Sequence, residues 1–130
     1  MKEEKEIYVV DDSHIIVSMI VQSVNQVEGL KATAFKAAEE MLIAAEVIQP
    51  DLVILDYFLD TEIKGGLNGG QAAKYIRAKF PESKILLISG TGSKTTLAEI
   101  ALLDIDAHIH KDEDDILELI NAKINTLLNL

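Results

Sequence analysis

Five polar residues directly follow short apolar runs of the sequence and could act together. Asp11 and Asp12 follow the first such run, and Asp56, Ser89 and Lys111 follow three later ones. Three carboxylates held close together repel one another, so such a group takes up either a proton or a cation. Because the ligands would be hard oxygens and the chain has no cysteine, the expected cation is Mg²⁺. Mg²⁺ held by carboxylates beside a hydroxyl and an ammonium group indicates a site that handles phosphoryl groups.

These five residues can meet only if the apolar runs lie side by side as strands. The chain alternates short apolar runs, which predict strands, with longer amphipathic stretches, which predict helices. The predicted strands are residues 7–10, 30–35, 52–55, 85–88 and 107–110. The predicted helices are residues 13–27, 37–48, 71–80, 95–103 and 114–128. Ser13 and Ser93 are the expected N-caps of the first and fourth helices, and Pro50 and Pro81 end the second and third.

The order of these elements predicts the fold class. Strands that alternate with helices predict an α/β fold with a parallel sheet, and short all-apolar strands predict that helices cover both faces of that sheet. Ligands of such sheets bind outside the carboxyl ends of the strands. Since the five polar residues stand at those ends, the sequence predicts that they converge at one edge of the sheet.

Composition limits the class of protein further. The 130 residues, 48% of them hydrophobic, predict one globular domain over residues 1–130. The formal net charge of −10 argues against direct binding of nucleic acid by this segment, because phosphate backbones attract clustered Lys and Arg. The charged start MKEEKE indicates no signal peptide, and the interrupted apolar runs predict neither a membrane span nor a membrane partner. The lack of cysteine fits a cytoplasmic protein.

Four separated motifs resemble the receiver domain of two-component response regulators, the fold of the single-domain chemotaxis regulator. Asp11 and Asp12 in VVDDS match the paired acids of that family, and Asp56 in DLVILDY matches its phosphoacceptor. Ser89 in ILLISG and Lys111 in HIHKD match its hydroxyl residue and its lysine, with the family's spacing between them. The resemblance covers essentially the whole chain. It implies a flavodoxin-like five-stranded parallel sheet of order 2-1-3-4-5 with helices on both faces.

The resemblance also implies a metal site. Asp12 and Asp56 would bind Mg²⁺ directly, with the backbone carbonyl of Phe58 as a third protein ligand. Asp11 would act mainly through metal-bound water. The only cofactor that the resemblance implies is therefore Mg²⁺.

The implied activity is a phosphorylation switch. Asp56 would take a phosphoryl group from a phosphohistidine of a sensor histidine kinase or phosphotransfer protein, and Ser89 and Lys111 would hold the phosphoryl oxygens. Inward movement of Ser89, coupled to His108, would reshape the face built by the fourth helix, last strand and last helix for a downstream protein or effector domain. Phosphoryl uptake and loss would be self-catalysed, so the chain is not expected to be an enzyme. A phosphorylation-dependent dimer stays open.

The chain departs from the family pattern after the lysine. The family usually has a proline there, often in a cis peptide, whereas this chain has Asp112 after Lys111. A cis bond before a non-proline residue is costly, so we expect a trans bond or a locally different loop. Asp112, Asp114 and Asp115 carry negative charge that is favourable near the N-terminus of the last helix.

A second departure is the length of the loop after Asp56. LNGG at residues 67–70 resembles the usual turn into the third helix, set back by an insertion around residues 60–66. The insertion could be a lid or a contact with a specific partner near the phosphoacceptor. A tolerated surface insertion is the favoured interpretation.

The other two departures are side chains near the expected site. His108 stands where the family has a Tyr or Phe that switches between inward and outward rotamers, and its titration could make the switch sensitive to pH. Phe58, two residues after the phosphoacceptor, could shield an acyl phosphate from water and lengthen its lifetime.

Other functions fit the sequence less well. A nucleotide-binding module of the same architecture needs a Gly-rich or hydroxyl-rich loop after the first strand, where this chain has Asp11 and Asp12. A Mg²⁺-dependent phosphohydrolase with an Asp nucleophile usually has a general acid at the position of Phe58. A degenerate receiver that acts only by docking would have no need of the five polar residues that this chain retains.

The histidines are the remaining candidate ligands. His108 and His110 alternate with Ile109 and should face the same side of a strand. Together with His14 they match no recognised zinc spacing. We interpret them as packed or surface histidines.

Overall fold

The computed structural model describes residues 4–59, 66–90 and 94–130. Within these ranges five strands alternate with five helices. The strands are β1 (Lys5–Val10), β2 (Leu30–Phe35), β3 (Leu52–Asp56), β4 (Lys84–Ser89) and β5 (Ala107–His110). The helices are α1 (His14–Asn25), α2 (Ala38–Val47), α3 (Gly69–Lys79), α4 (Lys94–Ala101) and α5 (Ile116–Leu127). All strand pairs are parallel and the order is β2-β1-β3-β4-β5, so the predicted fold is confirmed.

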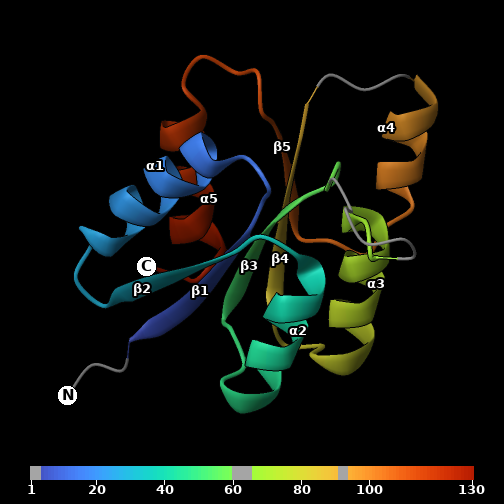
Figure 1. Ribbon diagram of the computed structural model, residues 1–130. Helices are drawn as coiled ribbons and strands as arrows, with labels where there is room; N and C mark the ends of the chain where they lie inside the picture. The colour runs from blue at the N-terminus through green and yellow to red at the C-terminus, as the bar shows by residue number, and fades with distance from the viewer. Residues whose placement is uncertain (1–3, 60–65, 91–93) are drawn as a thin grey trace.

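Helices cover both faces of the sheet, as Figure 1 shows, with α1 and α5 on one face and α2, α3 and α4 on the other. Because side chains alternate along each strand, every strand contributes residues to the apolar core on both faces of the sheet. On β1, Ile7 and Val9 pack in the core under α1 and α5, whereas Tyr8 and Val10 pack in the core under α2 and α3. Because both faces of the sheet are covered, the middles of the central strands are apolar and buried, at residues 52–55 of β3 and 85–88 of β4.

Two predicted helix starts differ in detail from the observed ones. Ser13 is the N-cap of α1 as predicted, but its side chain makes no capping hydrogen bond. Helix α3 begins at Gly69, two residues before the predicted start, because Asn68 and Gln71 form a capping box. The Gln71 amide donates to the Asn68 side chain at 2.9 Å, and the Asn68 amide donates to the Gln71 side chain at 3.0 Å. The LNGG segment is therefore the start of the helix as well as the turn before it.

The last two helices are shorter than predicted. Helix α4 ends at Ala101 rather than residue 103, and α5 covers Ile116–Leu127 rather than 114–128. Helix ends fray, so apolar periodicity places them only to within a residue or two. The predicted N-cap Ser93, and residues 60–65 of the predicted insertion, lie outside the described residues. No helix in the described ranges is long and apolar enough to cross a membrane.

The tight approach of α3 to β3 fixes the segment after the phosphoacceptor candidate. The Tyr57 amide donates to the Ile88 carbonyl of β4 at 2.8 Å, and the Gly69 amide donates to the Tyr57 carbonyl at 3.2 Å. A Cβ at position 69 would overlap the Asp56 carbonyl oxygen and the Tyr57 Cα. Only glycine lets the start of α3 lie this close to the end of β3.

Candidate functional site

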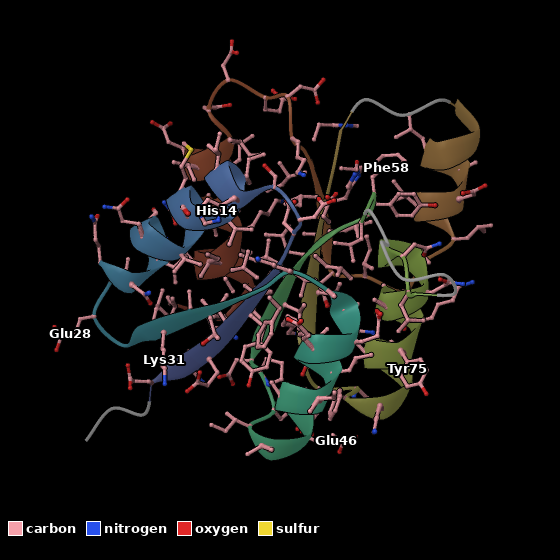
Figure 2. The ribbon with its side chains drawn as sticks, viewed as in Figure 1. His14, Glu28, Lys31, Glu46, Phe58 and Tyr75 are labelled. Atoms are coloured by element: carbon pink, nitrogen blue, oxygen red, sulfur yellow. The ribbon has the colours of Figure 1, made fainter. Side chains whose placement is uncertain are left out.

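Three carboxylates meet at the carboxyl edge of the sheet. Asp11 and Asp12 follow β1, Asp56 ends β3, and one oxygen from each lies within 4.8 Å of the others. Asp11 and Asp56 are each 2% exposed, whereas Asp12 is exposed. Figure 2 shows the same edge between His14, at the start of α1, and Phe58, beyond the end of β3. The predicted acidic cluster is therefore present, with one carboxylate open to solvent.

Lys111 is the cationic partner of the two buried carboxylates. Its Nζ lies 2.8 Å from Asp11 Oδ2 and 3.1 Å from Asp56 Oδ2. The other oxygen of each carboxylate accepts from backbone, Asp11 Oδ1 from the Ser13 amide at 2.8 Å and Asp56 Oδ1 from the Phe58 amide at 3.1 Å. These contacts orient Oδ2 of both carboxylates toward the Lys111 ammonium group.

Burial and close contacts shift the pKa values of Asp11 and Lys111. Burial is the largest cause that raises the pKa of Asp11, which reaches about 6; the Asp56 charge raises it further, while Lys111 and the Ser13 amide lower it. Burial lowers the pKa of Lys111, but its close contacts with the carboxylates of Asp11 and Asp56 outweigh that effect and leave the pKa raised. Lys111 is therefore a permanent cation here, whereas Asp11 gains a proton in mildly acid solution.

The cluster fits a divalent cation with hard ligands. Asp11 Oδ2 is buried and accepts no hydrogen bond of good geometry, although Lys111 Nζ lies 2.8 Å away. A buried carboxylate oxygen left in this state is costly, and a hydrated Mg²⁺ beside Asp12 and Asp56 would satisfy it. Among the described residues, these three acids are the only group of three or more ligating side chains close enough to hold one ion. The carbonyl of Phe58 as a further ligand stays a prediction.

Ser89 and His108 are joined at the same edge of the sheet. Ser89 ends β4 with 1% of its surface exposed, and its Oγ lies 2.7 Å from Nε2 of His108 on β5. Burial first, and then the charge of nearby His110, lower the pKa of His108 from 6.5, so the ring is neutral at pH 7. The predicted sensitivity to pH would therefore fall below pH 6.5.

The peptide bond after Lys111 precedes an aspartate instead of the family's usual proline, and the end of β5 still pairs with the end of β4. The described residues contain no cis peptide bond, so the Lys111–Asp112 bond is trans, as predicted. The Lys111 amide donates to the Ser89 carbonyl at 2.7 Å, which ties the end of β5 to the end of β4. Asp115 is the N-cap of α5 but makes no side-chain capping bond, so its expected role is limited to its charge.

The remaining histidines do not form a metal group with His108. The rings of His108 and His110 lie 4.9 Å apart between centroids on one face of β5, whereas His14 is exposed at the start of α1. This agrees with the interpretation of these residues as packed or surface histidines.

Sequence reasoning missed one contact near the site. Tyr57, the residue after Asp56, donates its hydroxyl to Glu99 Oε2 of α4 at 2.8 Å. Burial first, and then the bond to Glu99, raise the pKa of Tyr57. Its ring packs edge-on against Phe58, which is 46% exposed. No spacing in the sequence links residues 57 and 99, so the pattern carried no signal for this contact.

The comparison of known structures shows the same fold. DrrB, an OmpR/PhoB homologue of Thermotoga maritima, has a TM-score of 0.81 at 19% identity, over 97% of this chain and 53% of DrrB. This chain therefore spans about half of DrrB. The BeF₃-activated receiver domain of DrrB has a TM-score of 0.81 at 19% identity, over 98% of this chain and 99% of that one. The response regulator domain of Thermotoga maritima CheB has a TM-score of 0.78 at 20% identity, over 98% of each chain.

The sequence comparison identifies the family. The family described as response regulator receiver domain matches residues 7–122. No curated protein matches the chain in sequence. The match begins within β1 and covers the other four strands and the acidic cluster, in agreement with the motifs at the strand ends. The chain therefore belongs to the response regulator receiver domain family.

Proposed function

We propose that the chain accepts a phosphoryl group on Asp56 from a phosphohistidine, in a reaction that depends on Mg²⁺. The observation that carries this proposal is the position of Asp56, which is buried, 3.1 Å from Lys111 Nζ and within 4.8 Å of two further carboxylates. A nucleophilic carboxylate beside a fixed cation and a cation site is what in-line transfer of a phosphoryl group needs. The donor would be a sensor histidine kinase or a phosphotransfer protein.

In the transfer, an Asp56 carboxylate oxygen attacks the phosphorus of the phosphohistidine. The new O–P bond forms as the P–N bond breaks, and the imidazole of the donor leaves with a proton from solvent. Lys111, which forms ion pairs with Asp11 and Asp56 before the reaction, then faces the charge of the phosphoryl oxygens. Asp12 and Asp56 would hold Mg²⁺ directly, with Asp11 acting mainly through metal-bound water, and the bound ion would supply the remaining positive charge. The Ser89 hydroxyl donates to a phosphoryl oxygen.

The output of the switch is a changed surface rather than a released product. Ser89 and His108 connect the phosphoacceptor edge to β5 and the neighbouring α4. We infer that the phosphoryl group alters the face built by α4, β5 and α5, and that this face controls a downstream protein or effector domain. The chain loses the group by self-catalysed hydrolysis, acts in the cytoplasm and binds no nucleic acid itself.

Intact-mass measurement tests the proposal. The protein is incubated with acetyl phosphate, with and without Mg²⁺, beside an Asp56→Asn variant. We expect a single phosphoryl adduct that requires Mg²⁺ and is missing in the variant. An adduct that persists in Asp56→Asn would place the chemistry on another residue.

The opposite result favours a receiver that works only by docking. If no adduct forms, and beryllofluoride leaves the spectrum of the protein unchanged, the five residues do not assemble a working site. A phosphohydrolase would instead release phosphate from many monoesters with turnover. The exposed apolar side chain of Phe58, where such an enzyme usually has a general acid, supports the switch over the hydrolase.

A further inference from the structure

Tyr57, the residue after the phosphoacceptor, is held by three other elements of the fold. Its amide donates to the Ile88 carbonyl of β4 at 2.8 Å, and its carbonyl accepts from the Gly69 amide of α3 at 3.2 Å. Its hydroxyl donates to Glu99 Oε2 of α4 at 2.8 Å. The backbone next to Asp56 is therefore joined to α4 through a single side chain.

The ring of Tyr57 packs on both of its neighbours in space. Toward α3, a Cβ added at Gly70 would come within 3.3 Å of Cε1 of the ring. Toward solvent, the ring meets that of Phe58 edge-on, with the centroids 5.0 Å apart and the planes at 87°. Aromatic rings favour this geometry. In the part of the chain that the structure describes, Tyr57 is the aromatic residue against which Phe58 packs, so its position determines where Phe58 lies.

Helix α4 supplies the acceptor for the Tyr57 hydroxyl from an exposed position. Glu99 is exposed, and it lines a groove of about 300 Å³ between α3 and α4 together with Tyr57 and Lys74. The hydroxyl keeps its proton, because burial and then the bond to Glu99 raise the pKa of Tyr57. A hydrogen bond to a carboxylate is stronger than one between neutral groups. The bond thus anchors the outer end of the ring.

Phe58 is close to the carboxylate that would carry the phosphoryl group. Its amide donates to Asp56 Oδ1 at 3.1 Å, and its side chain is 46% exposed at the edge of the sheet (Figure 2). In hydrolysis, the oxygen of water attacks the phosphorus as the bond from phosphorus to the Asp56 oxygen breaks. Inorganic phosphate and the free carboxylate result, and a proton of the water passes to solvent. An apolar ring that excludes water from the phosphorus slows this step.

We propose that Tyr57 is a positioning residue whose hydrogen bond to Glu99 holds the Phe58 ring beside Asp56 and so lengthens the lifetime of the acyl phosphate. The inference rests on the proposed function and adds a control of its reversal. Because Glu99 belongs to α4, the position of that helix determines how firmly Phe58 is held.

The decay of the phosphorylated protein tests the role of Tyr57. The protein is loaded with acetyl phosphate and Mg²⁺, the donor is removed, and the remaining adduct is followed by intact mass. Tyr57→Phe keeps the ring and loses the hydroxyl, and its adduct should decay about threefold faster. Tyr75→Phe is the matched control, because it removes the hydroxyl of an exposed tyrosine of α3, and its adduct should decay as that of the wild type does.

Variants of Glu99 and Phe58 separate the hydrogen bond from a change in packing. Glu99→Gln keeps an acceptor for the Tyr57 hydroxyl and should preserve the lifetime, whereas Glu99→Ala should shorten it as Tyr57→Phe does. The double variant Tyr57→Phe/Glu99→Ala should decay no faster than either single variant, because both changes remove the same bond. In a Phe58→Asn background the ring to be positioned is gone, so Tyr57→Phe should have no further effect.

Each outcome decides between the two claims. No adduct on the wild type overturns the proposed function, and the role of Tyr57 with it. An adduct whose decay is unchanged in Tyr57→Phe overturns the role of Tyr57 alone. Faster decay that Glu99→Ala does not reproduce, or that persists in the Phe58→Asn background, assigns the effect to other contacts of Tyr57 and also overturns that role.

Discussion

At the scale of single residues, the site holds a carboxylate in an unfavourable state. Asp11 is 2% exposed and shares one lysine with Asp56. Burial, and then the Asp56 charge, raise the pKa of Asp11 from 3.8 to about 6 against the opposing effect of Lys111. The folded protein therefore binds the Asp11 proton more tightly than the unfolded chain does. The contribution of Asp11 to the free energy of unfolding therefore falls as the pH rises from 4 to 6, and this penalty is complete above about pH 7.

Asp11→Asn should accordingly stabilise the metal-free protein. A rise in pKa from 3.8 to about 6 corresponds to about 3 kcal/mol, and loss of the ion pair to Lys111 offsets part of it. We expect the free energy of unfolding in EDTA to rise by about 1–3 kcal/mol at pH 7.5, with little difference at pH 4. Urea denaturation at both pH values measures it. Asp114→Asn, which removes an exposed charge before α5, should change it by less than about 0.5 kcal/mol.

Phe58 gives a second prediction at the residue scale. Its side chain follows the phosphoacceptor by two residues and packs edge-on against Tyr57, with 46% of its surface exposed. Phe58→Asn should admit water and speed hydrolysis of the acyl phosphate by up to about tenfold, equal to about 1.4 kcal/mol of barrier. The decay of the phosphorylated mass after removal of acetyl phosphate measures the rate. Tyr75→Asn changes an exposed aromatic residue of α3 instead, and an equal effect there would refute shielding.

At the scale of elements, the start of α3 positions the phosphoacceptor segment. The capping box of Asn68 and Gln71 starts the helix, and the Gly69 amide bonds the Tyr57 carbonyl. The absence of a side chain at Gly69 lets the helix reach the end of β3. The backbone that carries Asp56 is thus held by β4 on one side and by α3 on the other.

Gly69→Ala should disturb that arrangement. Its Cβ would overlap backbone atoms of Asp56 and Tyr57, which cannot move as a flexible side chain could. We expect the free energy of unfolding to fall by about 1–3 kcal/mol. Phosphorylation by acetyl phosphate should also slow under conditions where the protein stays folded.

Gly70→Ala is the matched control for that variant. Its Cβ would lie 3.3 Å from Cε1 of the Tyr57 ring, a side-chain atom that can give way. Alanine also favours the helix over glycine, by about 1 kcal/mol. We expect Gly70→Ala to be as stable as the wild type or more so, with normal phosphorylation. Equal losses in both variants would show that the close approach at Gly69 is unimportant.

At the scale of the whole molecule, charge is the dominant feature. The chain carries 22 acidic and 12 basic residues, and two of the acids are buried beside a third. Such a molecule gains stability from any cation that it binds only when folded. Electrostatic screening by salt adds a weaker effect without a specific site.

Mg²⁺ should therefore stabilise the protein beyond the effect of ionic strength. At a free concentration ten times its Kd, binding to the folded state alone adds about 1.4 kcal/mol. The gain should shrink at pH 5, because a proton on Asp11, whose pKa is about 6, competes with the metal. Thermal unfolding with MgCl₂ or with NaCl at equal ionic strength measures it. Equal stabilisation by both salts, or by MgCl₂ in Asp56→Asn, would contradict a specific site.

The sequence by itself determined which residues reach the edge of the sheet. Apolar runs that end at Asp11, Asp56, Ser89 and Lys111 predicted the strands, and parallel strands bring their carboxyl ends together whatever the details of packing. The fold and the acidic cluster were predictable for that reason. The trans bond after Lys111 followed from the cost of a cis bond without proline.

Only the tertiary structure decided how these residues pair. Ser89 bonds a residue 19 positions away, Tyr57 one 42 positions away, and Lys111 one 55 positions away. Such pairs depend on side-chain rotamers and on the distances between elements packed against the sheet. The periodicity of apolar residues along the chain contains no information about either. The close approach of α3 to the end of β3 belongs to the same class, since the position of Gly69 against Asp56 and Tyr57 is a contact between elements. The positions of the strand ends thus follow from the local sequence pattern, whereas the hydrogen bonds and ion pairs of the site follow from tertiary packing.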